Sequence, residues 1–195
     1  MLEALITSKT KLKMLLKFFL NTSNTGFLRG LAVEFNESTN SIRLELNKLE
    51  EAKLLESQFE GPRKVFRANA KHPLFPDIQS IVRKYIGIED IIQSVILHLG
   101  NPYEVYLMGE LAQGIDSDKL NLLIMGENID IDYLDTLVAK AQKLVSRDIG
   151  YLVLSPEEFK QQYPRLNQQN LLLIWQNDEL MTEKSSQDKP GLKSV

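Results

Sequence analysis

Residues 38–69, STNSIRLELNKLEEAKLLESQFEGPRKVFRAN, contain the pattern that decides the fold of the first part of the chain. Ser38 or Thr39 can cap a helix, because their short side chains accept hydrogen bonds from free N–H groups of the first turn. The helix should end near Glu51. Its apolar side chains recur at helical spacing and are expected to be buried: Ile42, Leu46 and Leu49.

A β-hairpin is expected directly after this helix. Residues 54–59 and 64–69 read as two short strands, because apolar and β-branched positions are interleaved with polar ones. Gly61-Pro62 between them is a dipeptide typical of a tight turn.

Two more helices are expected upstream. Residues 9–20 have apolar side chains at helical spacing, with lysines on the other side. The segment NTSNTG at 21–26 interrupts the pattern, and a short second helix is expected at 27–35. Three helices followed by a hairpin is the element order of a winged helix-turn-helix, which we assign to residues 1–73.

This arrangement predicts an interface with double-stranded DNA. The third helix would lie in the major groove, and its exposed side chains would reach base edges. The hairpin would contact phosphates or the minor groove. Lys9, Lys11 and Lys13 would add positive charge nearby. The candidate DNA-binding residues are Thr39, Asn40, Ser41, Arg43, Asn47, Lys48, Arg63, Lys64 and Arg67. The alternative is that these side chains form an ordinary solvated surface.

The distribution of charge supports this assignment. The whole chain has a net charge of −3, which by itself argues against a nucleic-acid ligand. Residues 1–86, however, hold 14 basic and nine acidic side chains, a net charge of +5, and the remainder has a net charge of −8. A polyanion is therefore expected to meet the first part of the chain.

The sequence of this part also resembles the ArsR/MarR-type winged-helix regulators. The resemblance lies in NESTNSIRLELNKLEEAKLL at 36–55 and EGPRKVFRANAKHPLF at 60–75. It implies transcriptional regulation through DNA binding. Two positions depart from the family pattern. Lys53 stands where the family usually has Gly, so a left-handed backbone is expected there. Leu44 stands at a place that is often polar, so one base or phosphate contact is expected to be missing.

The family includes metal sensors, which need clustered Cys or His ligands. The chain has no cysteine, and its two histidines are His72 and His98. We therefore expect no metal site and no cofactor. The absence of cysteine also excludes disulfides and thiolate catalysis. No signal peptide and no membrane-length apolar run is evident, so we expect a cytoplasmic protein without a membrane partner.

The rest of the chain divides into three segments. Residues 74–97 read as a linker helix broken near Gly87, which could contribute to a dimer interface. Residues 98–179 alternate strand and helix patterns, including a helix over 131–146 whose inner face would contain Leu144. Residues 180–195 are polar, and we expect them to be disordered. The expected fold class is α+β: a winged helix-turn-helix followed by a small α/β domain.

Residues 103–126, YEVYLMGELAQGIDSDKLNLLIMG, resemble the start of a minimal nucleotidyltransferase domain. That family has a Gly-Ser turn for nucleotide phosphates, and an Asp-x-Asp strand that holds Mg²⁺. The scaffold positions are retained, but the chemical ones are not. The residues at this degenerate nucleotide site are Gly109, Glu110, Lys119 and Asn121. Glu110 would repel a triphosphate, and Lys119 cannot bind Mg²⁺.

We therefore expect no catalytic residues, and a regulator whose second domain serves for dimerisation or ligand sensing. The expected partners are double-stranded DNA, a second copy of the chain, and a nucleotide or small-molecule effector. One alternative is an active, Mg²⁺-dependent nucleotidyltransferase targeted by its winged helix. It would use Asp116 and Asp118, a nearby Asp-x-Asp pair in a loop. The other is a winged helix that binds protein.

Overall fold

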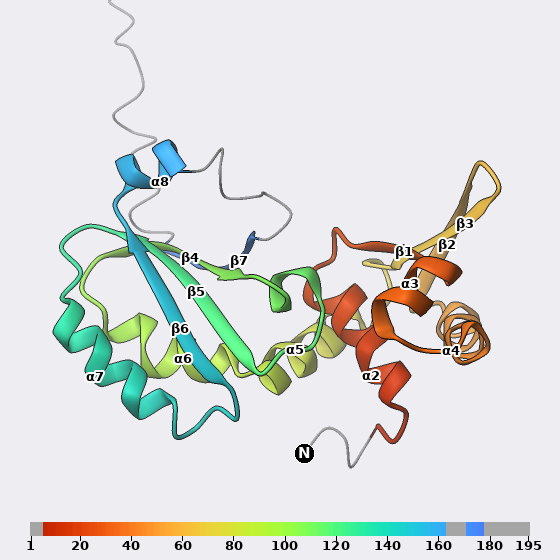
Figure 1. The fold of residues 1–195 in the computed structure, drawn as a ribbon, viewed down its shortest axis with the longest axis horizontal. Helices are drawn as coiled ribbons and strands as arrows, with labels where there is room; N and C mark the ends of the chain where they lie inside the picture. The colour runs from red at the N-terminus through yellow and green to blue at the C-terminus, as the bar shows by residue number, and fades with distance from the viewer. Residues whose placement is uncertain (1–5, 163–170, 178–195) are drawn as a thin grey trace, which may run out of the picture.

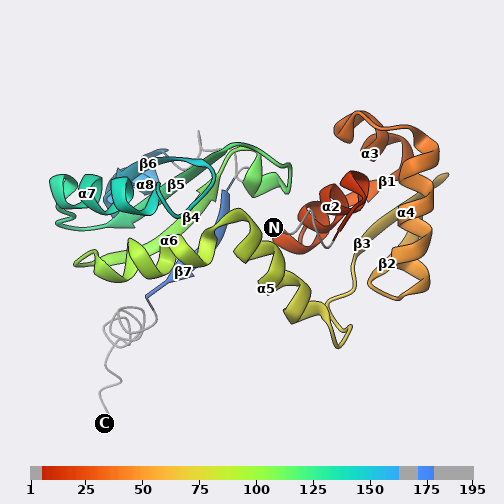
Figure 2. The same ribbon diagram turned by 90° about the horizontal axis from the view of Figure 1, so that it is seen from below.

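The computed structural model describes residues 6–162 and 171–177, which form two α+β parts placed side by side (Figures 1 and 2). The predicted tail at 180–195 lies outside the described residues. In chain order the first part contains α2 (Lys9–Leu15), the π-helix η1 (Leu16–Leu20), β1 (Thr25–Phe27), α3 (Leu28–Phe35), α4 (Thr39–Glu51), β2 (Leu55–Glu60) and β3 (Arg63–Ala68).

The first part is a winged helix-turn-helix. Its three strands form an antiparallel sheet in the order β1-β3-β2, and β2 and β3 make the predicted hairpin. The three-residue strand β1 was not expected, because it falls in the polar segment that breaks the first helix from the second. Ile42, Leu46 and Leu49 of α4 are buried as predicted.

The second part is a four-stranded mixed sheet with helices on both faces. In chain order its elements are α5 (Phe75–Ile86), α6 (Ile88–Ser94), the 3₁₀ helix η2 (Ile96–His98), β4 (Pro102–Met108), the 3₁₀ helix η3 (Leu111–Gln113), β5 (Lys119–Gly126), α7 (Ile131–Ala141), β6 (Asp148–Leu154), α8 (Pro156–Gln162) and β7 (Leu171–Gln176). The strand order is β6-β5-β4-β7, and only β5 and β6 are parallel. Helices α6 and α7 cover one face, and α8 lies on the other (Figure 1).

The alternation of strands and helices predicted for the second part is confirmed within the described residues. The linker helix is indeed broken at Gly87, whose φ of 89° ends α5 and begins α6. The helix predicted over 131–146 was too long, because α7 ends at Ala141. Beyond it, the Gln142 amide donates to the carbonyl of Arg147 and accepts from the N–H of Ile149, which fixes the return to β6. Leu144, predicted to face inward, is 66% exposed.

The segment η1 lies at the junction between the two parts. Leu16, Phe18, Phe19 and Leu20 are all almost completely buried. Such a run is apolar around the whole helix rather than along one stripe, so it requires neighbours on several sides. Helix α5 supplies one of them, with the rings of Phe19 and Phe75 5.7 Å apart.

Side-chain amides then join the first part to the loop that follows β4. The buried Asn21 donates to the carbonyl of Ala112 over 2.8 Å, and Asn24 donates to that of Gln113 over 2.8 Å. Gly114 lies so close to η1 that a Cβ there would be 2.6 Å from the Cα of Lys17. The two parts therefore meet backbone to backbone.

The end of α4 confirms the left-handed backbone predicted at Lys53, whose φ is 59°. The N–H of Lys53 bonds the carbonyl of Glu50 over 2.8 Å, and the N–H of Leu54 bonds that of Leu49 over 2.9 Å. These two bonds are the Schellman arrangement that commonly ends helices, usually with Gly at the left-handed position. No helix among the described residues is both long and apolar enough to cross a lipid bilayer.

Replacing Lys53 by Gly should stabilise the protein. A side chain in the left-handed region costs about 1–2 kcal/mol, part of which returns as the greater flexibility of Gly in the unfolded chain. We expect Lys53→Gly to raise the free energy of unfolding by about 1 kcal/mol in urea titrations, with an unchanged m-value. Lys53→Ala is the control, since it retains the Cβ and should bring little gain. Equal stability of the two variants would contradict the explanation.

Candidate nucleic-acid interface

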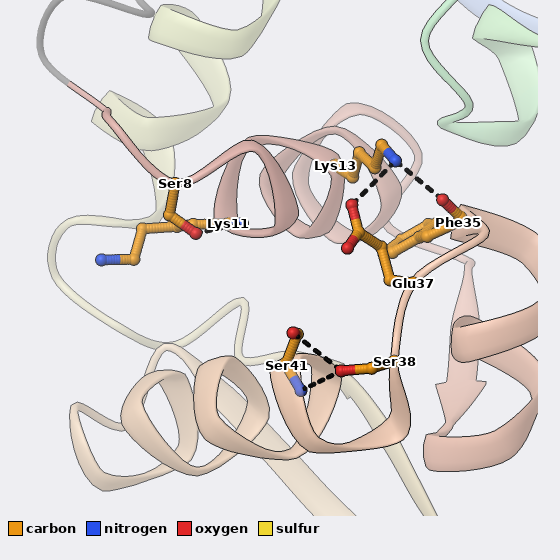
Figure 3. A network of polar contacts seen from close by, with 7 residues as sticks. All are labelled: Ser8, Lys11, Lys13, Phe35, Glu37, Ser38 and Ser41. Carbon is orange, nitrogen blue, oxygen red and sulfur yellow. Dashed lines mark hydrogen bonds and ion pairs between the residues drawn. The ribbon is translucent and has the colours of Figure 1, made fainter.

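The turn between α3 and α4 fixes the direction of α4, and α2 holds this turn in place (Figure 3). The ammonium group of Lys13 donates to the carbonyl of Phe35, the last residue of α3, over 2.7 Å, and to the Glu37 carboxylate over 3.1 Å. A cation is favourable at the C-terminal end of a helix, where carbonyl groups lack partners. Lys13 thus stabilises the turn.

Helix α4 begins as the sequence predicts. The hydroxyl of Ser38 accepts a hydrogen bond from the N–H of Ser41, and the two hydroxyl oxygens are 2.9 Å apart. Figure 3 shows both side chains turned toward each other at the helix start. Ser41 is half-buried and participates in the cap, so its hydroxyl is already engaged in the absence of DNA.

A buried carboxylate anchors the middle of α4 to α2. Glu45 is only 7% exposed. It accepts a hydrogen bond from the Ser8 hydroxyl over 3.1 Å, and lies 3.7 Å from the ammonium groups of both Lys11 and Lys48. Lys11 therefore binds within the protein, as Lys13 does. Of the three α2 lysines expected to add charge near DNA, two have partners in the helix-turn-helix itself.

The opposite side of α4 is exposed to solvent. Figures 1 and 2 show that α4 and the hairpin lie on the side of the first part that faces away from the second part. A long, straight ligand such as duplex DNA could therefore approach α4 without meeting the second sheet. The exposed residues of α4 are Thr39, Asn40, Arg43, Leu44, Asn47, Lys48 and Glu51.

A groove of about 640 Å³ separates α4 from the hairpin and the start of α3. Its polar lining consists of Arg29, Arg43, Asn47, Arg63 and Lys64, above a floor that includes Leu46 and Phe66. Within the described part of the chain, none of the three arginines forms an ion pair. Guanidinium groups are well suited to phosphate and to guanine edges.

The hairpin cations differ in their surroundings. Lys64 lies 2.7 Å from Glu50, and the pKa of the Glu50 carboxyl is lowered by hydrogen bonds from Lys64 and then from Ser57. Arg67 lies 2.7 Å from Glu56. Arg63 instead lies over the ring of Phe27, 4.8 Å from its centroid. Of the three predicted hairpin cations, Arg63 alone therefore has no carboxylate partner among the described residues.

Arg29 was missing from the residues selected on the sequence. It stands in the first turn of α3 and is exposed, and the groove brings it near Arg43 and Arg63. The pattern of α3 does give a signal, because Arg29 lies off its apolar stripe. Its proximity to the hairpin, however, depends on the pairing of β1 with β3, which the sequence did not reveal.

Asn121 is the central residue of the nucleotide site that the sequence predicts in degenerate form. In the sheet this residue is opposite Met108 on one side and Gly150 on the other. Its amide covers Gly150 and lies 3.8 Å from the position of a Cβ on Gly109, whose φ is 73°. Lys119 is exposed two residues earlier on the same strand face, and Glu110 is exposed in the turn after Gly109.

The loop carboxylate Asp116 is bound by a buried arginine. Arg147 is 8% exposed and lies 2.9 Å from Asp116. The same guanidinium donates to the carbonyl of Ser117 and lies over the ring of Tyr85. The Tyr85 hydroxyl is 3.5 Å from the other Asp116 oxygen. Over residues 6–162 and 171–177, no three His, Asp or Glu side chains gather in a way that could hold a metal ion.

Searches for a matching protein-family model and for a related curated protein both find none. Solved structures give weak matches, each to about half of the chain. AF1382 from Archaeoglobus fulgidus is 23% identical, with 48% of this chain and 98% of that chain covered and a TM-score of 0.35. Reduced HlyU from Vibrio cholerae N16961 is 13% identical, with 47% and 82% covered and a TM-score of 0.33. A "putative nucleotidyltransferase" from Sulfolobus solfataricus is 20% identical, with 52% and 88% covered and a TM-score of 0.36.

Proposed function

We propose that this protein is a DNA-binding transcriptional regulator. The observation that carries the proposal is the groove between α4 and the hairpin, where three arginines without ion-pair partners in the described residues come together. Clustered unpaired arginines repel one another, and a polyphosphate backbone removes that repulsion. The exposed side of α4 adjoins the groove and offers amide and guanidinium groups that match base edges.

The expected binding mode follows from this geometry. Helix α4 enters the major groove with Asn40, Arg43 and Asn47 toward the bases. Arg63, beside the hairpin turn, then reaches the adjacent backbone or minor groove. Arg29, which lies across the protein groove from α4, binds a DNA phosphate. Lys64 and Arg67 contribute less, because carboxylates already neutralise them.

We further propose that the second part has no nucleotidyl transfer activity and serves for dimerisation or ligand sensing. Lys119 and Asn121 occupy the strand positions where the resemblance calls for two carboxylates. The nearby Asp116 is engaged by Arg147 at 2.9 Å, so it is not free to take up Mg²⁺. The loop after β4 contacts η1 directly, which gives a bound effector a route to the winged helix.

The DNA proposal predicts a steep dependence of duplex affinity on salt. Removal of Arg29 or Arg63 singly should reduce the magnitude of the slope of log K against log salt by about one, since each binds one phosphate, whereas Arg43→Ala should relax the preference at one base pair. Arg43→Ala combined with Arg63→Ala should abolish binding in fluorescence anisotropy. Lys140→Ala, an exposed cation on α7, is the matched control and should change nothing. Arg67→Ala should have a smaller effect than Arg63→Ala.

The proposal would be overturned if duplex affinity changed neither with salt concentration nor on removal of these arginines. A complete lack of affinity for every duplex, together with a co-purifying protein, would favour a winged helix that binds protein.

The proposed inactivity of the second part predicts no product when the protein is incubated with labelled ATP, Mg²⁺ and candidate acceptors. Asp116→Ala should leave this result unchanged, because the carboxylate is tied to Arg147. Turnover that disappears in Asp116→Ala would restore the enzyme alternative.

We expect a homodimer, because one winged helix reads only a few base pairs and symmetric operators suit two-fold proteins. Leu74, which directly precedes α5, and Ile81 within it are 55% and 47% exposed, so this surface is available for such a contact. Sedimentation equilibrium at micromolar concentration should give twice the chain mass. A monomer under these conditions would contradict the expectation.

A further inference from the structure

Leu44 is an anomaly on the exposed side of α4. The other leucine and isoleucine side chains of this helix are at most 5% exposed, whereas Leu44 is 53% exposed. Single exposed leucines are common on protein surfaces and need no explanation by themselves. Leu44 is of interest because it lies within the proposed DNA interface.

Polar side chains surround Leu44 along the helix. Residues three and four positions apart are neighbours on a helix surface, so Leu44 lies between Asn40 on one side and Asn47 and Lys48 on the other. Arg43 precedes it and lines the groove. The side-chain amides of Asn40 and Asn47 have no hydrogen-bond partner among the described residues, and both residues are exposed. The centre of this surface is therefore apolar, with free amides at both ends.

The major groove of DNA offers one apolar group, the 5-methyl of thymine. A leucine side chain can pack on this methyl, but it cannot satisfy the amino donor of cytosine or the acceptors of guanine. Asparagine pairs with the N6 and N7 of adenine through two hydrogen bonds. An apolar centre between two free amides thus fits a short A·T-rich sequence better than a G·C-rich one.

We propose that Leu44 reads the 5-methyl group of a thymine in the DNA site, between adenines that face Asn40 and Asn47. This inference rests on the proposed DNA-binding function. A protein partner is the other way to cover Leu44. The cations around it favour the polyanion, since Arg43 and Lys48 flank Leu44 on the helix and Arg29 and Arg63 lie across the groove.

The test first isolates bound duplexes from a randomised library, using the full-length protein. Each thymine of the selected site is then replaced by deoxyuridine, which removes only the methyl group. For the wild-type protein, replacement of one particular thymine in a single half-site should weaken binding about fourfold, the factor expected from the burial of one methyl group. In Leu44→Ala the same replacement should have no effect, since the methyl group has lost its contact.

Val33→Ala is the matched control. Val33 is 83% exposed on α3, so its truncation also removes an exposed apolar side chain from the helix-turn-helix. This variant should keep the fourfold effect of deoxyuridine. Wild-type protein and Leu44→Ala are each measured on the thymine duplex and on the deoxyuridine duplex. These four affinities form a double-mutant cycle, which isolates the contact between Leu44 and the methyl group.

Two results would overturn the inference alone: wild-type affinity that ignores every deoxyuridine, or an equal deoxyuridine effect in Leu44→Ala. In both cases the salt-dependent binding through Arg43 and Arg63 would still stand. Failure of the wild-type protein to bind any duplex would instead overturn the proposed function, and this inference with it. Loss of a co-purifying protein in Leu44→Ala, with no duplex binding, would assign the surface to a protein partner.

Discussion

Both parts of the molecule depend on the burial of the π-helix η1, Leu16–Leu20. Four of these five side chains are at most 4% exposed, and they are buried against helix α5 and the winged-helix core. These four apolar side chains lie on different sides of the helix, so no single partner could bury them. The segment therefore requires neighbours that come from distant parts of the sequence.

The lysines of α2 and η1 differ from the arginines of the groove in their partners. Lys11, Lys13 and Lys17 lie near Glu45, Glu37 and Glu34, at 3.7, 3.1 and 2.7 Å. These ion pairs connect α2 and η1 to α3, to α4 and to the turn between them. Exposed ion pairs contribute little to stability, but these fix the position of α4. The groove residues Arg29, Arg43 and Arg63 form no ion pair among the described residues.

The sequence was informative wherever a local rule acted alone. Ser38 caps α4, and Lys53 adopts the left-handed backbone that its position demanded. The break at Gly87 was also expected, because Gly readily ends one helix there. Each of these features depends on a few neighbouring residues, and for that reason the pattern of side chains predicted it.

The features that the sequence did not reveal depend on long-range packing. Strand β1 is only three residues long and exists because β3 pairs with it. The groove position of Arg29 depends on the same pairing. The inward direction of Lys11 and Lys13 requires carboxylates that lie 24 to 34 positions later in the chain. Composition and periodicity contain no information about such partners.

The contact between Asn21 and the carbonyl of Ala112, 91 positions away, has a consequence for how the protein can be divided. A cut after residue 73 would be the natural choice for an isolated winged helix. It would remove the helix that covers Phe19 and the carbonyl that satisfies Asn21, and so leave an apolar surface and an unpaired buried amide. The winged helix-turn-helix is thus continuous with the second part, and during synthesis it reaches its final packing only after β4 and the following Ala112 have emerged.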